Sequence, residues 1–459
     1  MGRLVATAAA ALCALLAACG GSGNGGGTSP GGCSDTREKR FVLDTAREWY
    51  LFDDLLPAGV GADDYATAEE LLDALTAEAR AQGKDRFFSY LTSRQADDAI
   101  FQAGQFIGFG FRTRIEGDRL WLTDVYEDSP AEDGGLARGV EITEIDSGSG
   151  FVPVATVLAG DPELEEAFGP ATEGVERGVR FLLPGGGEAE AVITKRIVAI
   201  TPLAQGGASV LALPANPAVP VGYFNLRSFI STAEAPLRDA YAEFRAQGVE
   251  YFVVDLRYNG GGLVSVAELI GDLNGALRDD SDVYLEMRFN DRKSRGNDVV
   301  RYFQPRAESV GPVRIAFITT GLTASASEIV INSLAPWAEV AIVGGDTLGK
   351  PVGQAAFDLS GCDLRLRLIA FQFNNADGQG EYYDGLAATL PFACRADDDL
   401  AYDPGDPGEA STAEALNWLG SGACTEVLPA ASLALRGTGW RVPKPRKPAA
   451  AQVYLPGLY

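Results

Sequence analysis

The sequence of 459 residues contains no histidine. Imidazole is the usual base that activates a serine hydroxyl and a frequent metal ligand, so its absence excludes a Ser-His-Asp triad and any site that needs a histidine. Hydrolysis by this chain would require another base, and a desolvated neutral lysine is one of the few side chains able to take a proton from serine. We predict no metal ion and no cofactor.

Positive charge is also scarce. The chain has 38 Lys and Arg against 63 Asp and Glu, a net charge of -25, and its one basic block lies at 444–447. A surface this acidic keeps a protein soluble and repels phosphate backbones, which argues against nucleic acid as a partner. The length allows two or three domains with their own cores.

The apolar run at the start, residues 4–18, is shorter than the roughly 20 residues that a membrane-spanning helix needs. It ends in small residues, which predicts a cleaved export signal over 1–18. Leu-Ala-Ala-Cys at 16–19 resembles a bacterial lipobox and implies lipidation of Cys19 on a protein of the bacterial cell envelope that faces the periplasm. Ordinary soluble secretion is the alternative. The Gly- and Ser-rich stretch within 19–36 fits a flexible tether.

Cysteines are few, six in all. Loss of Cys13 with the signal and acylation of Cys19 would leave four: Cys33, Cys362, Cys394 and Cys424. An even number in an exported chain favours two disulfides. Three pairings are possible, and we favour Cys362 with Cys394 and Cys33 with Cys424. A metal site of four thiolates is the rival, but no CxxC spacing supports it.

Three textures follow one another after the tether. Residues 37–100 carry helical periodicity and predict a small N-terminal helical module, whereas 101–200 alternate short strands with glycine turns, as in a compact β-rich domain. Residues 201–459 alternate strands with helices, which predicts an α/β core with a largely parallel sheet. Its expected strands are 221–226, 251–256, 314–320 and 339–344, and its expected helices are 231–247, 263–277 and 325–334.

Two helix starts carry capping signals. Ser231 with Glu234 resembles a capping box, and at 406–409 Asp406 is expected to cap a helix whose box Glu409 completes. An acidic calcium loop over 397–409 is the sharper alternative, although the alternation of such a loop is missing.

The chemistry concentrates in Thr-Ala-Ser-Ala-Ser-Glu at 323–328 and in Gly349-Lys350. Ser325 follows a predicted strand and stands in the first turn of a predicted helix, where unpaired N–H groups favour developing negative charge. Lys350 lies 25 positions later, after the helix and strand that return the chain to the same sheet edge. Each motif alone is also compatible with a helix cap rich in small residues or with a surface lysine.

These stretches, together with Asp-Leu-Arg-Tyr-Asn-Gly-Gly-Gly at 255–262, resemble the carboxyl-terminal processing proteases, also called tail-specific proteases. The resemblance implies a Ser-Lys dyad with Ser325 as nucleophile, Lys350 as general base and Gln354 as the residue that orients the lysine. Ser327 is the second choice of nucleophile. Two positions depart from the family pattern, Pro351 where glycine is usual and Gly260 where proline is usual.

The same resemblance implies an oxyanion hole made by backbone N–H groups. The donors expected are that of Gly261 or Gly262, together with that of Ala326. Glycine suits this task because its backbone approaches a substrate carbonyl without a Cβ in the way.

The β-rich domain resembles a PDZ domain in two places. Its expected carboxylate-binding loop is Gly108, Phe109, Gly110 and Phe111, and residues 128–136 resemble the turn and helix found later in such domains. The loop implies binding of peptide or protein C-terminal tails, which would add to a strand edge.

Together these features predict a serine endopeptidase that cleaves exported proteins or peptides and recognises their C-terminal tails. To act as a base, Lys350 must lower its pKa by roughly 2 to 3 units, at a cost of about 3 to 4 kcal/mol. The alternative is a non-catalytic peptide- or lipid-binding envelope lipoprotein of the same fold. A PDZ-type scaffold and an esterase are the other readings that the sequence leaves open.

Overall fold

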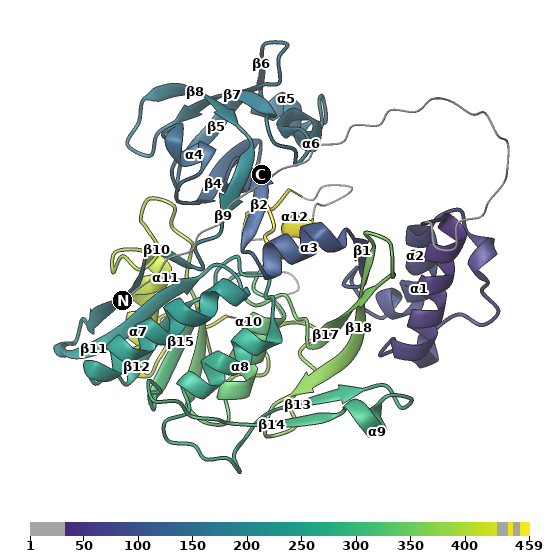
Figure 1. Ribbon diagram of the computed structural model, residues 1–459. Helices are drawn as coiled ribbons and strands as arrows, with labels where there is room; N and C mark the ends of the chain where they lie inside the picture. Colours follow the sequence, from purple (N-terminus) through teal and green to yellow (C-terminus); the bar gives the residue numbers. More distant parts are fainter. Residues whose placement is uncertain (1–32, 429–438, 444–449) are drawn as a thin grey trace, which may run out of the picture.

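The computed structural model describes residues 33–428, 439–443 and 450–459. Figure 1 shows a β-rich domain above a larger α/β body, with the first two helices packed at one side of that body. The expected fold class is confirmed: a helical module and a β-rich domain precede an α/β core with a largely parallel sheet. The signal, the tether and Cys19 fall within 1–32, outside the described residues.

The N-terminal module begins with three capped helices. They are α1 (Asp35–Trp49), α2 (Ala68–Ala81) and α3 (Arg94–Phe101), with the short 3-10 turns η1 (Asp53–Leu55) and η2 (Ala62–Asp64) between the first two. A hydroxyl residue before each α-helix accepts a hydrogen bond from the N–H three residues later. The expected helical segment is interrupted by one strand, β1 (Tyr90–Thr92), which pairs with β18.

The β-rich domain is built from short antiparallel strands. They are β2 (Gln105–Gly108), β3 (Phe111–Glu116), β4 (Arg119–Val125), β5 (Glu141–Asp146), β6 (Phe151–Pro153), β7 (Glu176–Leu182), β8 (Glu188–Thr194) and β9 (Arg196–Ala199). One sheet runs in the order β20-β3-β4-β5-β7-β8, with β6 paired to β5, and β2 pairs with β9 separately. The helices α4 (Pro130–Asp133), α5 (Val154–Leu158) and α6 (Leu164–Phe168) close this domain.

A six-stranded sheet forms the centre of the body, in the order β10-β11-β12-β15-β16-β19. Its strands are β10 (Leu203–Leu213), β11 (Asn216–Leu226), β12 (Tyr251–Asp255), β15 (Arg314–Thr319), β16 (Glu339–Gly344) and β19 (Phe392–Arg395). All neighbours pair in parallel except β10, which is antiparallel to β11. The predicted strands of the core are therefore confirmed.

Helices cover both faces of this sheet, which explains the continuous apolar runs of its strands. One face packs against α7 (Glu234–Ala246), α8 (Val264–Leu273) and α10 (Ala326–Leu334), and the other against α11 (Ala410–Ser421). On β12 the side chains alternate accordingly, Phe252 and Val254 toward the first face and Val253 toward α11.

A second sheet joins the N-terminal module to the body. Its strands are β13 (Val283–Phe289), β14 (Val299–Tyr302), β17 (Val352–Asp358) and β18 (Arg365–Asn374), with β1 at one edge and α9 (Ser294–Asn297) between β13 and β14. Apolar residues of α1 and α2 pack against β17 and β18. Near the end of the chain, β20 (Trp440–Arg441) pairs with β3, and α12 (Ala450–Tyr454) lies beside α3 (Figure 1).

The favoured disulfide pairing is wrong. The bonds join Cys33 to Cys362, with Cα atoms 5.6 Å apart, and Cys394 to Cys424, with Cα atoms 5.0 Å apart. Cys362 lies in the turn between β17 and β18, against the start of α1, whereas Cys394 is on β19 of the sheet that α11 covers. Tertiary packing decides the pairing: α1 packs against β17 and β18, far along the chain, and α11 covers the sheet that contains β19.

Both predicted caps also differ. The Ser231 hydroxyl donates to Gln102 O at 2.9 Å, and a 3-10 turn, η3 (Ser231–Ala233), comes before α7. Asp406 accepts from Gly408 N at 2.7 Å within a turn, so α11 starts later, with Glu409 itself as the N-cap. In both cases the side chain bonds locally or to another element instead of the helix it was expected to start.

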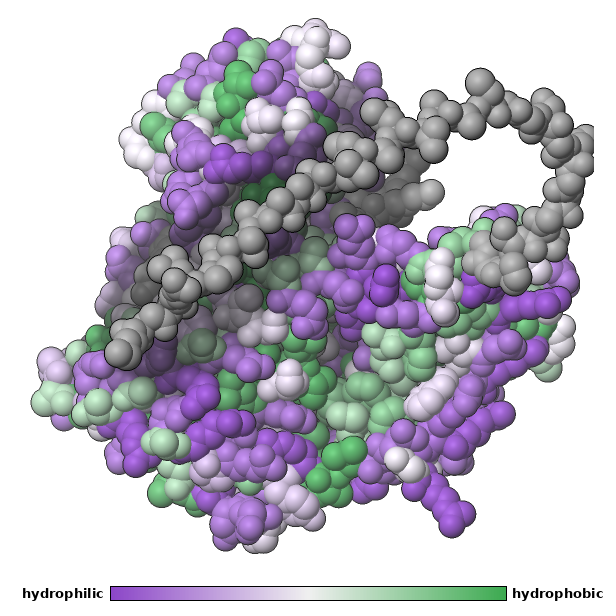
Figure 2. Space-filling model, viewed as in Figure 1, coloured by the Kyte–Doolittle hydropathy of each residue, from purple (hydrophilic) through white to green (hydrophobic). Residues whose placement is uncertain are grey.

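Hydrophilic residues predominate on the face drawn in Figure 2, and the surface is hollowed where the β-rich domain meets the body. None of the described helices combines the length and the apolar character required to cross a bilayer.

Candidate active site

Ser325 stands at the sharp turn between β15 and α10. Its φ of 56° and ψ of -119° lie in a region that residues with a side chain rarely adopt. The turn is fixed from within, because the Thr323 hydroxyl donates to Leu256 O at 2.8 Å and accepts from Thr320 N at 3.0 Å. A strained strand-to-helix turn that presents a serine at the edge of a sheet is the geometry of a nucleophile elbow.

Lys350 is buried, with 6% of its surface exposed. Its Nζ donates to Gln354 Oε1 at 3.1 Å and lies 5.0 Å from the centre of the Phe88 ring. Burial lowers the pKa of Lys350 to about 8, although the charges of Asp85 and Glu328 act in the opposite direction. This lowering raises the uncharged fraction of the amine near neutral pH.

One carboxylate joins the serine turn to the lysine loop. Glu328 Oε2 accepts from Ser325 N at 2.9 Å and from Lys350 N at 2.8 Å, and its Oε1 accepts from Gly349 N at 2.7 Å. Because Ser325 N and Lys350 N both donate to the same oxygen of Glu328, the backbones of the serine turn and the lysine loop lie close together. Burial raises the pKa of Glu328, while these donors and the Thr347 hydroxyl oppose the rise.

The two side chains themselves do not meet in this arrangement. Lys350 Nζ donates to Gln354, and among the described residues no hydrogen bond joins it to Ser325 Oγ. Catalytic hydrogen bonds often tighten only when substrate binds, so the arrangement is compatible with a dyad that closes on its substrate.

The glycine loop lies directly against the serine. A Cβ on Gly261 would stand 2.8 Å from Ser325 Cβ and 2.9 Å from Ala326 N, and the φ of Gly261 is +98°. Only glycine allows this approach. The N–H of Gly261 donates to Asn259 Oδ1 at 2.9 Å. Among the described residues, the N–H groups of Gly262 and Ala326 remain without such a partner and are the better candidates for an oxyanion hole.

Ser327 has a structural role instead of a chemical one. It is fully buried, and its hydroxyl donates to Asn259 O at 3.1 Å. Pro351, the unusual neighbour of Lys350, is also buried and accepts from Phe373 N at 3.0 Å. The proline leaves the lysine amine directed at Gln354.

The N-terminal module supports the lysine loop, a contact that the sequence did not reveal. Arg86 donates to Leu348 O at 2.8 Å and also to Gly349 O, and Gln354 Nε2 donates to Phe88 O. The loop between α2 and β1 thus holds both the backbone before Lys350 and the side chain of Gln354, which accepts the hydrogen bond from the lysine amine.

The loop at 108–111 gathers three backbone N–H groups on one oxygen. Phe109 N, Gly110 N and Phe111 N donate to the main-chain oxygen of Tyr459 at 3.0, 2.9 and 3.4 Å. Gly110 has a φ of +87°, and a Cβ on Gly108 would stand 3.0 Å from the same oxygen. In this structure the loop is therefore occupied by the chain's own residue 459.

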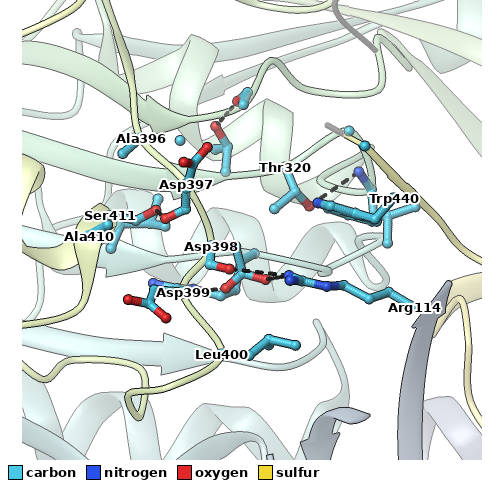
Figure 3. Close-up of a pocket in the computed structure, with 18 of the residues that line it drawn as sticks. Arg114, Thr320, Ala396, Asp397, Asp398, Asp399, Leu400, Ala410, Ser411 and Trp440 are labelled. Atoms are coloured by element: carbon cyan, nitrogen blue, oxygen red, sulfur yellow. Dashed lines mark hydrogen bonds and ion pairs between the residues drawn. The ribbon is translucent and has the colours of Figure 1, made fainter. Parts of the chain in front are cut away.

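A cavity of about 1040 Å³ lies between the β-rich domain and the core, beside this site (Figure 3). The segments 320–322 and 346–348, which lead to Ser325 and Lys350, form part of its wall, but neither Ser325 nor Lys350 lines it. Figure 3 shows Arg114 reaching from the β-rich domain to Asp398 on the facing loop.

Asp398 is the centre of a buried charge network that ties the two parts together. It pairs with Arg114 and Arg138 of the β-rich domain and with Arg257 of the core, at 2.8, 2.6 and 2.8 Å. Burial alone would raise the pKa of Asp398, but the three guanidinium groups outweigh it and lower the pKa to about 2. Arg257 also binds Glu409 at 2.8 Å. Asp398 and Glu409 both lie in the segment 397–409, for which a calcium loop was the alternative interpretation, and both carboxylates bind arginines.

Nothing in the described chain resembles a metal centre with free ligands. One group of metal-binding residue types comes together, Cys394, Glu414 and Cys424, and both its cysteines are in a disulfide. The strained serine, the buried lysine and the glycine loop are together the arrangement of a serine-type peptidase, with the Ser325 turn and the Lys350 loop at the same edge of the sheet.

Two family models match segments of the chain. The model of peptidase family S41 matches residues 220–389, and that of the peptidase S41 N-terminal domain matches residues 37–90. The matched segments are thus similar to the domains of peptidase family S41, and together with the curated carboxyl-terminal-processing proteases they support a serine-type peptidase.

Curated relatives include carboxyl-terminal processing peptidases, and solved structures share the fold. The carboxyl-terminal-processing protease of Synechocystis is 25% identical over 356 residues, which is 73% of this chain and 76% of that protein. The chloroplastic C-terminal processing peptidase of Tetradesmus obliquus is 29% identical, over 56% of this chain and 54% of its own length. A putative S41 protease from Bacteroides fragilis has the same fold, with a TM-score of 0.66, 21% identity, and coverage of 83% of this chain and 97% of that one. A photosystem II D1 C-terminal processing protease superposes with a TM-score of 0.50 and 19% identity, covering 86% and 100%.

Proposed function

We propose that the protein is a Ser-Lys endopeptidase that cleaves exported proteins or peptides. The observation that carries the proposal is the Glu328 carboxylate, which holds the Ser325 turn and the loop of a buried lysine on one oxygen atom. A lysine desolvated in this way has the lowered pKa that a general base needs near neutral pH.

In the proposed reaction, neutral Lys350 Nζ accepts the proton of the Ser325 hydroxyl while Oγ attacks the scissile carbonyl carbon. The N–H groups of Ala326 and Gly262 stabilise the oxyanion of the tetrahedral intermediate. The C–N bond then breaks, and Lys350 returns the proton to the leaving amine. Water attacks the resulting ester and gives its proton to Lys350. The bond between the acyl carbon and Ser325 Oγ then breaks, Lys350 returns the proton to Oγ, and the shortened peptide leaves as a carboxylic acid. Gln354 keeps the lysine amine in position between these steps.

For recognition we propose that the β-rich domain acts as a PDZ domain. The convergence of Phe109 N, Gly110 N and Phe111 N on one oxygen supports binding of a peptide's terminal carboxylate, and the edge of β3 supports pairing with an extended tail. We further propose that a lipid on Cys19 anchors the protein in the bacterial envelope, where it would meet exported substrates.

The test is labelling by a fluorophosphonate probe, which reacts covalently with an activated serine. The parent should label, Ser325→Ala should not, and Lys350→Ala should label at a rate reduced by on the order of 1,000-fold, as for loss of a general base. Ser327→Ala is the matched control and should label like the parent, because its hydroxyl is buried on Asn259 O. Equal labelling of the parent and Ser325→Ala would reject the nucleophile, and lack of labelling in a folded parent would favour the non-catalytic binding protein.

A further inference from the structure

The segment 450–459 runs along the surface that connects the lysine to the loop at 108–111. In Figure 1 α12 lies next to α3, and the end of the chain is marked beside β2 at the base of the β-rich domain. Side chains of this segment are buried against the domain and the helical module: Ala451, Tyr454, Leu455, Leu458 and Tyr459. The segment is therefore a packed part of the structure.

One end of the segment binds as a peptide ligand binds a sheet edge. Tyr459 N donates to Phe111 O at 3.0 Å, Leu458 forms an antiparallel bridge with Arg112, and Thr113 N donates to Gly457 O at 2.9 Å. These bonds place residues 457–459 as an added strand beside β3, which is the mode called β-augmentation. The ladder ends at the oxygen of Tyr459 that takes three N–H donors, an arrangement suited to a negatively charged oxygen.

The last side chain fills an aromatic pocket. The Tyr459 ring lies 4.4 Å from that of Phe168 and 6.3 Å from that of Phe111, centre to centre, and 6% of Tyr459 is exposed. Lys195 Nζ lies nearby, 4.9 Å from the centre of the Phe109 ring. The pocket around residue 459 therefore suits an aromatic ring.

The other end of the segment touches the catalytic side. The Tyr454 hydroxyl donates to Gln354 Oε1 at 3.1 Å, the atom that also accepts from Lys350 Nζ. The carbonyl oxygen of Tyr454 stands where a Cβ on Gly260 would be 2.5 Å from it. Gly260 precedes the glycine that lies against Ser325, so the segment covers the approach to both the base and the glycine loop.

We infer that residues 450–459 are a built-in competitor of the substrate tail. They occupy the tail-binding groove and the approach to the catalytic residues at once, so a substrate tail must displace them before it reaches Ser325. The groove takes, by the same geometry, extended peptides that end in a free carboxylate on an aromatic residue preceded by leucine. The effect on catalysis depends on the proposed function, whereas the occupancy of the groove does not.

The expected size of the effect follows from tethering. A ligand that is part of the same chain as its groove competes at an effective concentration on the order of 1 mM. If the free peptide binds the empty groove with a dissociation constant of about 10 μM, the tether weakens its apparent affinity about 100-fold.

The experiment measures binding of a fluorescent peptide with the sequence of residues 453–459, by anisotropy. The parent is compared with a variant that lacks 457–459 and with Tyr459→Ala, both checked for folding by thermal unfolding. The deletion should bind about 100-fold more tightly than the parent, Tyr459→Ala should fall between them, and a C-terminally amidated peptide should bind the deletion at least 10-fold more weakly. The exposed Tyr302 on β14 supplies the control, and Tyr302→Ala should behave like the parent.

Equal affinity of the parent and the folded deletion would overturn the inference, as would a folded deletion that binds no peptide. Fluorophosphonate labelling of the deletion should be faster than that of the parent, and a slower rate in a folded deletion would show that the segment assists catalysis instead of blocking it. If neither protein labels but the peptide affinities differ as expected, the proposed peptidase activity fails while the competitor remains.

Discussion

Replacing Lys350 by methionine is expected to stabilise the fold while it removes activity. Methionine keeps most of the buried apolar stem but has no amine to desolvate. The pKa of Lys350 falls from 10.5 to about 8 on folding. At 1.36 kcal/mol for each unit, burial of the charged amine costs about 3 kcal/mol. Loss of the hydrogen bond to Gln354 lowers the stability of the variant by about 1 kcal/mol, which offsets part of this gain. We therefore expect the free energy of unfolding of Lys350→Met to exceed that of the parent by about 2 kcal/mol near neutral pH.

The pH dependence gives the sign of this effect. Below about pH 8 the lysine is charged in both the folded and the unfolded parent, and the full cost applies. Between about 8 and 10.5 the unfolded chain binds the proton and the folded chain does not, so the parent becomes more stable as the pH rises. The advantage of Lys350→Met should shrink by more than half between about pH 7 and about pH 9.5.

The assay is urea unfolding of both proteins at these two pH values, with equal m-values as the condition for comparison. Lys195 is the matched control: burial also lowers its pKa to about 8, but its amine donates to Gly169 O and Pro170 O at 2.8 and 3.0 Å. Lys195→Met loses both bonds, so it should gain less stability and should keep the parent's rate of fluorophosphonate labelling. A Lys350→Met variant less stable than the parent by the same amount at both pH values would refute the argument that Lys350 is desolvated.

Three further outcomes are expected. Ser325→Gly relieves the positive φ of that residue and should raise the free energy of unfolding by about 1 kcal/mol in urea, whereas Ser327→Gly should lower it. Glu328→Gln places an amide donor against backbone N–H groups and should slow fluorophosphonate labelling about 10- to 100-fold, and a labelling rate equal to the parent's would contradict the bridging role of the carboxylate. The low pKa of Asp398 contributes stability above about pH 4 that is lost as the pH falls toward about 2, so an acid unfolding series of Asp398→Asn should start from lower stability at neutral pH and change less over that range.

The parts of the fold that follow from local pattern were predictable. Buried apolar runs located the parallel strands, and the small residues around Ser325 located the start of α10. The expected fall of the lysine pKa agrees with the burial of Lys350 by its neighbours.

Contacts between distant segments were not predictable from pattern. The bond from Arg86 to Leu348 O spans 262 residues and that from Tyr454 to Gln354 spans 100, and nothing in either local sequence marks its partner. The disulfide pairing failed for the same reason, because the packing of α1 on β17 and β18 brings Cys33 to its partner. The motif at 323–328 includes Glu328, but nothing in a helix-capping glutamate indicates that its carboxylate also accepts hydrogen bonds from the loop of Gly349 and Lys350.

The bond between Cys33 and Cys362 encloses the stretch between them in a single covalent ring, with 329 positions separating its ends. A peptidase is exposed to its own activity and to that of its neighbours, and a cut at one place inside this ring opens it without releasing a fragment. Such a nicked molecule would migrate as one species until a reductant separates the pieces. The helices at its start would also stay attached to the strands that carry Gln354, so the support for the lysine would survive the first cleavage.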